Sequence, residues 1–254
     1  MQAENIRNFV HYFTTNTKVK IFMSKTFEID MYDGHLIFIS DGMKVLIDTG
    51  CSVTIGKENS FTFMGDGYAC RTSFGGRDIY SISQLMNYDI DVFMGMDIIE
   101  RFYVRTDYKR NQVTFSKEPL PVEQMSSTPI IRGQMGEVCI YLTIKGNNVK
   151  LALDTGAKIS YIDSSYTEGD NPIGIKDDFN PLIGHFQTPI FAMEASICDN
   201  PFPVNFGVLP PILAVPLQMM GIYGAIGFDL FNTFTVVMDF NPNRSLGFIG
   251  AIWQ

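Results

Sequence analysis

Two copies of the triplet Asp-Thr-Gly are the residues most suited to chemistry, at 48–50 and at 154–156. Such a triplet is expected only about 0.05 times by chance in a chain of this length, at ordinary residue usage. Each copy follows an apolar run typical of a buried strand, MKVLI before the first and VKLAL before the second. This repetition in matching contexts makes Asp48 and Asp154 the candidate catalytic residues.

Paired carboxyl groups support a hydrolytic chemistry. Two carboxylates about 3 Å apart cannot both ionise easily, so they share a proton and titrate as one unit. One member then activates a water molecule as a general base, and the other donates a proton to the carbonyl oxygen under attack. Thr49 and Thr155 can bond across to the opposite half, and Gly50 and Gly156 let backbone amides approach the carboxylates. The arrangement hydrolyses an amide without a metal ion, a cofactor or a covalent intermediate.

A second pair of segments shows that the chain repeats itself. Residues 91–115 resemble residues 224–248 when Gly95 is aligned with Gly227. The same alignment pairs Asp97 with Asp229, Phe102 with Phe234, Val104 with Val236, Asp107 with Asp239 and Asn111 with Asn243. Each copy is typical of a buried strand, a glycine, a short helical turn and a hairpin. The chain is therefore expected to consist of two related halves, each of which brings one aspartate to a shared site.

The repeat predicts a mainly β fold of two pseudo-symmetric lobes. The expected boundaries are an N-terminal extension over 1–24, a first lobe over 25–118, a linker over 119–129 and a second lobe over 130–254. The linker contains proline, serine and charged residues.

Local signals add detail to this plan. Hairpin turns are predicted at the Asp-Gly pair 33–34 and at the Gly-Asn-Asn run 146–148. One short helix is expected in each half, directly after Gly95 and after Gly227.

Composition excludes several classes of function. The 254 residues carry a net charge of −8 without a lysine- or arginine-rich run, which argues against a nucleic-acid partner. No apolar run of about 18 residues predicts a membrane span, and the four cysteines and three histidines lack metal-binding spacing. The first residues lack the pattern of a signal peptide, so a cytoplasmic location is expected, or a secreted or periplasmic one if a leader has been removed.

With these landmarks in place, residues 25–250 resemble the aspartic protease superfamily. The resemblance lies in the paired triplets, each followed later by an apolar-apolar-glycine strand, FMG at 93–95 and AIG at 225–227. Pepsin-like members are single two-lobed chains, and retroviral-type members are smaller and dimerise. This chain resembles a fused, compact form of that plan, closer in lobe size to the retroviral type, and its small size resembles a bacterial form.

The resemblance implies an aspartic endopeptidase that acts as a monomer on a peptide or protein substrate, with an active-site cleft between the two lobes. It implies Asp48 and Asp154 as the catalytic pair and support from Thr49, Gly50, Thr155 and Gly156. The alternative is a catalytically silent or autoinhibited peptide-binding module on the same scaffold, with its cleft blocked by residues 163–223 or by the N-terminal extension.

A flap that closes over the substrate is also implied by the resemblance. Residues 61–76 resemble the flap hairpin of the family, and its tip is expected at Met64, Gly65, Asp66, Gly67 and Tyr68. Met64 takes the place of the usual flap tyrosine, so the hydrogen-bonding hydroxyl is expected to be missing. An ordinary β-hairpin fits the same residues equally well. The second half is 26 residues longer between its landmarks (73 against 47), and the extra residues within 163–223 are expected to form a second wall of the cleft.

The residues after each triplet depart from the pepsin-like pattern of serine or threonine. They are Cys51 and Ala157, so each carboxylate is expected to accept fewer hydrogen bonds and to have a less depressed pKa. Activity is therefore expected at mildly acidic to near-neutral pH. Lys158 comes next in the second half, where it either binds a substrate carboxylate and lowers the pKa of the pair, or is a solvated surface charge.

Overall fold

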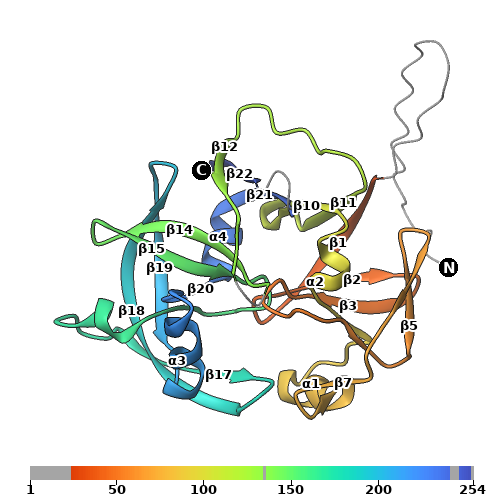
Figure 1. Cartoon of the computed structure of the whole chain (residues 1–254), viewed down its shortest axis with the longest axis horizontal. Coiled ribbons are helices and arrows are strands. Elements are labelled where there is room, and N and C mark those ends of the chain that lie inside the picture. Colours follow the sequence, from red (N-terminus) through yellow and green to blue (C-terminus); the bar gives the residue numbers. More distant parts are fainter. Residues whose placement is uncertain (1–23, 134–135, 241–245, 253–254) are drawn as a thin grey trace.

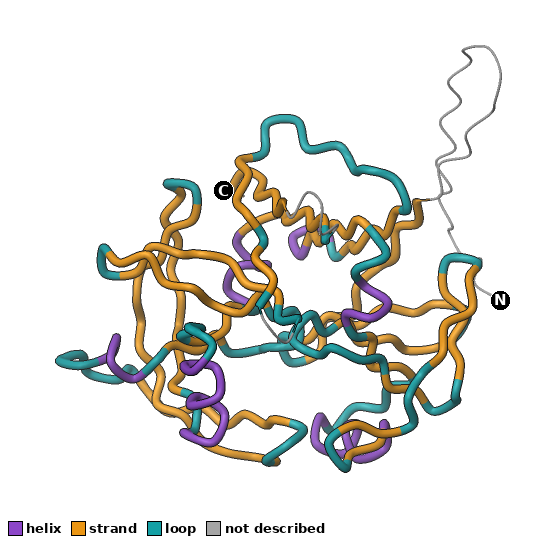
Figure 2. The backbone as a smooth tube through the Cα atoms, viewed as in Figure 1, coloured by secondary structure: helices purple, strands orange, loops and turns teal. Residues whose placement is uncertain are grey.

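The computed structural model describes residues 24–133, 136–240 and 246–252. The chain forms two β-lobes, with the first half on the right in Figure 1 and the second half on the left. Loops from both lobes meet at the centre of the view in Figure 2. The prediction of a mainly β fold with two pseudo-symmetric lobes is confirmed.

A ten-stranded sheet combines seven strands of the first lobe with three strands from later in the chain. In order across the sheet, its strands are β12 (Ser126–Pro129), β22 (Leu246–Ile252), β21 (Phe234–Asp239), β10 (Tyr103–Asp107), β11 (Gln112–Ser116), β1 (Ser24–Tyr32), β2 (His35–Ser40), β3 (Met43–Ile47), β9 (Val92–Met94) and β4 (Ile55–Gly56). Two hairpins lie outside this sheet, namely β5 (Ser60–Phe63) with β6 (Asp66–Ala69), and β7 (Ser73–Phe74) with β8 (Arg77–Asp78). The helical elements of this half are α1 (Ile79–Met86), α2 (Met96–Ile99) and the 3₁₀ turn η1 (Tyr108–Arg110).

An eight-stranded sheet forms the second lobe. In order across the sheet, its strands are β13 (Ile131–Arg132), β14 (Val138–Ile144), β15 (Asn147–Leu153), β20 (Gly224–Ile226), β16 (Ser160–Ile162), β19 (Asn200–Val208), β18 (Gly184–Ile197) and β17 (Gly174–Asn180). Strand β14 also pairs with β18, so the sheet curls back on itself. The helical elements are the 3₁₀ turn η2 (Ser164–Thr167), α3 (Pro211–Met219) and α4 (Phe228–Thr233).

The two lobes share one local topology around the triplets. Strand β3 runs parallel to β9, and β4 runs antiparallel to β9. In the second lobe β15 runs parallel to β20, and β16 runs antiparallel to β20. In both lobes the Asp-Thr-Gly loop therefore follows directly after a strand, and a strand from later in the chain runs parallel to that strand.

The pseudo-two-fold axis that relates the two lobes passes through the ten-stranded sheet. Strands β10 and β21 pair antiparallel, with Thr106 opposite Val236 and Val104 opposite Met238. The offset of 132 residues between Gly95 and Gly227 exchanges these two pairs. The centre of the exchange is the pair of Arg105 and Val237, so the axis passes through this point of the sheet.

A single buried apolar cluster extends through both lobes. Its largest members are phenylalanines with no more than 1% exposure, Phe38, Phe63 and Phe115 in the first half and Phe206, Phe231, Phe234 and Phe240 in the second. Burial of each large apolar side chain stabilises the fold by about 1.5–3 kcal/mol. The continuous cluster is therefore the main reason that the two lobes keep one relative arrangement.

The helices agree only in part with the sequence. Helices α2 and α4 follow Gly95 and Gly227, as predicted. Helix α1 is additional, and Asp78 caps it by accepting a hydrogen bond from the Ser81 amide at 2.8 Å. Helix α3 is also additional, and its nearly uniform apolar sequence PILAVPLQM has no polar face that would reveal a helical period.

The predicted turns and boundaries need two corrections. Asp33 and Gly34 form the first hairpin turn, with φ of 47° and 83°, as expected. The second turn is at Lys145 and Gly146, because the following asparagines already belong to β15. The predicted linker over 119–129 ends in strand β12, which pairs with β22. The predicted extension lies outside the described residues except for Ser24, the first residue of β1.

In the described part of the chain no helix is long and apolar enough to cross a membrane.

Candidate active site

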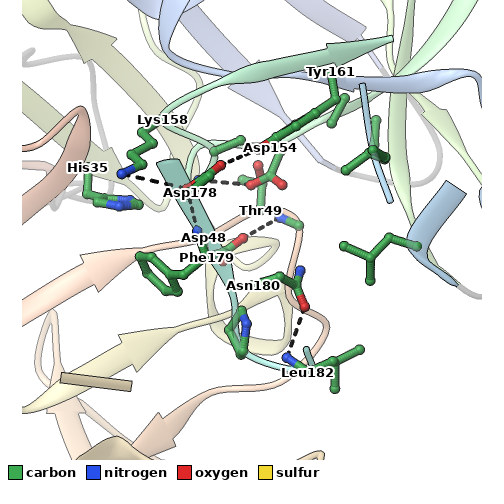
Figure 3. Close-up of a pocket in the computed structure, with 18 of the residues that line it drawn as sticks. His35, Asp48, Thr49, Asp154, Lys158, Tyr161, Asp178, Phe179, Asn180 and Leu182 are labelled. Atoms are coloured by element: carbon green, nitrogen blue, oxygen red, sulfur yellow. Dashed lines mark hydrogen bonds and ion pairs between the residues drawn. The ribbon is translucent and has the colours of Figure 1, made fainter. Parts of the chain in front are cut away.

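Asp48 and Asp154 come together where the two lobes meet. Asp48 follows β3, and its amide donates to the Met94 carbonyl at 2.9 Å; Asp154 follows β15, and its amide donates to the Ile226 carbonyl at 3.0 Å. The two side chains are hydrogen-bonded to each other. The structure thus brings the two predicted aspartates into one site (Figure 3).

The two glycines of the triplets make this approach possible. Each amide donates to the carboxylate of its own triplet, at 2.7 Å from Gly50 to Asp48 Oδ1 and at 2.9 Å from Gly156 to Asp154 Oδ1. A Cβ atom on Gly50 would lie 2.6 Å from Asp154 Oδ2, and one on Gly156 would lie 2.5 Å from Asp48 Oδ2. Any larger residue at either position would displace the opposite carboxyl group.

The two threonines form the base of the site. The Thr49 amide donates to Thr155 Oγ1 and the Thr155 amide donates to Thr49 Oγ1, both at 3.0 Å. The Thr49 hydroxyl donates to the Leu153 carbonyl at 2.6 Å, and the Thr155 hydroxyl donates to the Ile47 carbonyl at 3.0 Å. All four bonds cross between the lobes, so they fix the distance between the two aspartates.

The electrostatics of the pair favour one shared proton. Burial raises the pKa of Asp48 well above its usual range, and the negative charge of Asp154 raises it further. Burial also raises the pKa of Asp154, but hydrogen bonds from Asp48 and from the amides of Gly156 and Ala157 oppose this rise. The pair therefore holds one proton between its two members and titrates as one unit.

The residues after the triplets provide no hydroxyl to the carboxylates. Cys51 Sγ donates to the Val53 carbonyl at 3.2 Å instead. Burial and the nearby charge of Asp48 raise the pKa of the Cys51 thiol to about 12, so this cysteine is not a nucleophile at neutral pH. All four cysteines are free thiols. Within the described residues, no group of three or more histidine, cysteine, aspartate or glutamate side chains could hold a metal ion.

A second symmetric pair of contacts supports the site, and the sequence analysis assigned it no role. Thr54 Oγ1 donates to Asp97 Oδ1 at 2.6 Å and accepts from the Gly95 amide at 3.0 Å. In the second lobe Ser160 Oγ donates to Asp229 Oδ2, also at 2.6 Å. These bonds hold α2 and α4 against the loops of the triplets. The signal was present in the sequence, because Asp97 aligns with Asp229, and Thr54 and Ser160 share the offset of 106 residues that separates Asp48 from Asp154.

Two adjoining cavities open above the aspartates, with volumes of about 340 and 280 Å³. Asp48 and Asp154 line both of them. Apolar side chains form most of the remaining walls, including Met86, Leu213 and Leu217 in the first cavity, Ile55, Ile82 and Met96 in the second, and Phe93 in both. Each cavity is large enough to take an apolar side chain on one side of the aspartate pair.

A hairpin from the second lobe covers these cavities. It consists of β17 and β18, and Asn180, Pro181 and Leu182 at its tip line both cavities. Arg77 Nε in the first lobe donates to the Pro181 carbonyl at 3.0 Å. The second wall expected from residues 163–223 is therefore present as this hairpin, which we call the covering hairpin.

The structure does not place the predicted flap tip at the cleft. Residues 64–68 line neither cavity, because Met64 and Tyr68 are buried in the first-lobe core, where the Tyr68 ring meets that of Phe102 edge to face. Asp66 forms an ion pair with Lys117 at 2.7 Å. The part of the predicted segment that reaches the cleft is strand β7, where Phe74 lines the second cavity.

Lys158 lines the first cavity but is already paired. Its side chain is only 17% exposed, and Nζ lies 2.8 Å from Asp33 Oδ2 and 3.7 Å from Asp178 Oδ1. Neither sequence-based alternative describes this lysine, since it is not a solvated surface charge and two carboxylates already neutralise it. Asp178 also accepts from the Tyr161 hydroxyl and from the Phe179 amide.

His35 lies beside Lys158 and was not among the predicted site residues. It is 5% exposed, and neither ring nitrogen has a hydrogen-bond partner in the part of the chain that the structure describes. Its ring centroid is 5.8 Å from that of Phe179 in the covering hairpin. Burial and the positive charge of Lys158 lower the pKa of His35 to about 4, so the imidazole is neutral at physiological pH.

No family model and no curated protein matches the sequence. Among solved structures, the chain is similar to an aspartic proteinase from Irpex lacteus, with a TM-score of 0.50 and 9% identity over 91% of this chain and 98% of that one. It is also similar to a retropepsin-like aspartic protease from Rickettsia conorii (TM-score 0.34, 16% identity, 52% and 95% covered). A third similar structure is the protease of simian foamy virus (TM-score 0.24, 20% identity, 32% and 94% covered). The first likeness spans both lobes, and the chain therefore has the two-lobed fold of the aspartic protease superfamily.

Proposed function

We propose that the chain is an aspartic endopeptidase that hydrolyses peptide bonds with a water molecule activated by Asp48 and Asp154. The observation that carries this proposal is the hydrogen-bonded carboxyl pair at the floor of the cleft, with a raised pKa on both members. Fold alone does not imply activity, so the argument rests on the chemistry of this pair.

The proposed reaction assigns the shared proton of the pair to Asp48 and the negative charge to Asp154. Ionised Asp154 takes a proton from the water as its oxygen attacks the peptide carbonyl carbon, and protonated Asp48 gives its proton to the carbonyl oxygen. The resulting tetrahedral diol collapses when Asp154 returns its proton to the leaving amine and Asp48 takes back a hydroxyl proton. The C–N bond breaks, and both aspartates recover their starting protonation.

The walls of the cleft favour peptides with apolar residues on both sides of the cleaved bond. The two cavities meet over the aspartates, so a peptide that crosses the pair places one side chain in each of them. Since one chain supplies both aspartates, we propose that the monomer is the active unit, and a cytoplasmic location remains our expectation.

The test is hydrolysis of an unfolded protein and of a peptide library by the wild type, Asp48→Asn and Asp154→Asn. Either substitution should lower the rate at least about a thousandfold, because each aspartate is needed for a proton transfer. The control is Asp41→Asn in the exposed β2–β3 turn, where φ of 50° suits asparagine. Wild-type rates in either active-site variant would exclude the pair as catalytic.

The covering hairpin favours a second candidate, an autoinhibited or silent peptide-binding module. Its tip is hydrogen-bonded to Arg77 of the first lobe, so it spans the cleft over the two aspartates. A wild type that binds unfolded peptides in calorimetry but cleaves none of them would support this candidate over the enzyme.

A further inference from the structure

We propose that Asn180 is a substrate-binding residue that acts from the covering hairpin, where its side-chain amide donates a hydrogen bond to a backbone carbonyl of the bound peptide. The inference rests on the proposed function, because it concerns how a peptide lies across Asp48 and Asp154.

The position of Asn180 is fixed from two sides. It is the last residue of β17 and pairs with Gly184, the first residue of β18, so it closes the turn of the hairpin. Its Oδ1 atom accepts from the Leu182 amide at 2.9 Å. This bond identifies the oxygen end of the side chain and leaves Nδ2 at the other end, which points away from Leu182 in Figure 3.

The Nδ2 group has no acceptor among the residues that the structure describes, although Asn180 lines both cavities together with the two aspartates. A peptide that runs from one cavity to the other must therefore pass between Asn180 and the catalytic pair. Amide groups that lose water without gaining a partner cost about 1–3 kcal/mol each, so the covered cleft requires a donor that faces the peptide.

The backbone of the hairpin tip cannot supply that donor. Pro181 has no amide hydrogen, the Leu182 amide already donates to Asn180 Oδ1, and the Ile183 amide donates to the Asn180 carbonyl at 3.2 Å. The side-chain Nδ2 of Asn180 is thus the donor that the tip can offer. It takes over a task that the first-lobe residues 64–68 cannot perform, because these residues lie outside both cavities.

Two substitutions of Asn180 distinguish its role as a hydrogen-bond donor from its role in holding the turn. Asn180→Asp keeps an oxygen for the Leu182 amide but replaces the donor with a negative charge. Asn180→Ala removes both groups. The matched control is Asn171→Asp, the same change of side chain in an exposed loop before β17.

The experiment measures kcat and KM with a peptide that has apolar residues at the cleaved bond, and thermal unfolding in parallel. We expect kcat/KM to fall about tenfold in Asn180→Ala and further in Asn180→Asp, as one hydrogen bond to substrate is lost and then replaced by repulsion. Asn171→Asp should behave as the wild type. Unchanged kcat/KM in both Asn180 variants, with normal unfolding, would overturn the proposal.

A binding measurement separates this inference from the proposed function. In the Asp48→Asn background, calorimetry with the same peptide should show a Kd about tenfold weaker when Asn180→Ala is added. Loss of hydrolysis in every form with this weaker Kd would reject the enzyme and keep the peptide contact. Equal Kd values with and without Asn180→Ala would reject the contact even if the enzyme is active.

Discussion

Thr49 and Thr155 exchange hydrogen bonds across the junction of the lobes, with each backbone amide 3.0 Å from the hydroxyl oxygen of the other residue. Each hydroxyl in turn donates to a carbonyl of the opposite lobe. The two residues are buried, so every group of this exchange depends on a partner from the other half. The geometry of the aspartate pair and the cohesion of the lobes therefore have a common origin.

The first prediction concerns this exchange. Thr49→Val removes the hydroxyl and leaves the Thr155 amide and the Leu153 carbonyl unpaired, which should lower the free energy of unfolding by about 2–4 kcal/mol. Thr49→Ser keeps the hydroxyl and should cost about 1 kcal/mol or less. Denaturant unfolding measures both values. A Thr49→Val variant within about 0.5 kcal/mol of the wild type would show that the exchange does not hold the lobes together.

The second prediction concerns the pH dependence of hydrolysis. The raised pKa of Asp48 means that the pair loses its shared proton only at a higher pH than an ordinary carboxyl group would, so the alkaline limb of the rate profile moves up. The optimum should lie at mildly acidic to near-neutral pH. Ala157→Ser adds a hydroxyl donor beside Asp154 and should move the optimum down by about one unit or less. A wild-type optimum below about 3 would contradict this account.

The third prediction concerns His35 and the stability of the fold. The pKa of His35 is about 4 in the folded chain, against the ordinary value of 6.5 that applies to the unfolded chain. Between pH 4 and pH 6.5 the unfolded chain therefore binds more protons than the folded chain. Stability should therefore fall as the pH drops from about 6.5 to 4, by about 3 kcal/mol for this group. His35→Phe should remove this part of the decline and be neutral or stabilising at pH 7, because neither ring nitrogen is paired.

The control for this prediction is His185→Phe, since His185 is exposed on β18. Chemical unfolding of the three proteins from pH 7 to pH 4 gives the comparison. Parallel curves for the wild type and His35→Phe would show that His35 does not titrate in this range.

The fourth prediction concerns the contact of the covering hairpin with the first lobe. Gly75 and Gly76 form the β7–β8 turn, with φ of 59° and 78°, so alanine strains the backbone at either position. Only at Gly75 would the new Cβ meet another side chain, at 2.5 Å from Leu182 Cδ2, whereas Gly76 has free space around it. Hydrogen exchange at the Leu182 and Ile183 amides should be about tenfold faster in Gly75→Ala than in Gly76→Ala. Equal exchange rates would mean that the hairpin does not rest on this contact.

The sequence was most informative where a structural feature depends on neighbouring residues. The Asp33-Gly34 turn and the helices after Gly95 and Gly227 were predicted correctly, since each follows from a few adjacent residues. Helix α3 was missed, because a uniformly apolar segment carries no helical period. The flap tip was assigned to residues 64–68, but Met64 and Tyr68 gain more from burial in the core than from a place at the cleft.

The sequence by itself determined the pairing of Asp48 with Asp154 and the plan of two lobes, because each triplet shapes its own loop and the repeat brings two such loops to one axis. Only the tertiary structure decided what covers that pair. Arg77 meets Pro181, and Lys158 meets Asp33, across more than a hundred residues of chain. Contacts of this kind depend on how the lobes pack against each other, so no local sequence pattern predicts them.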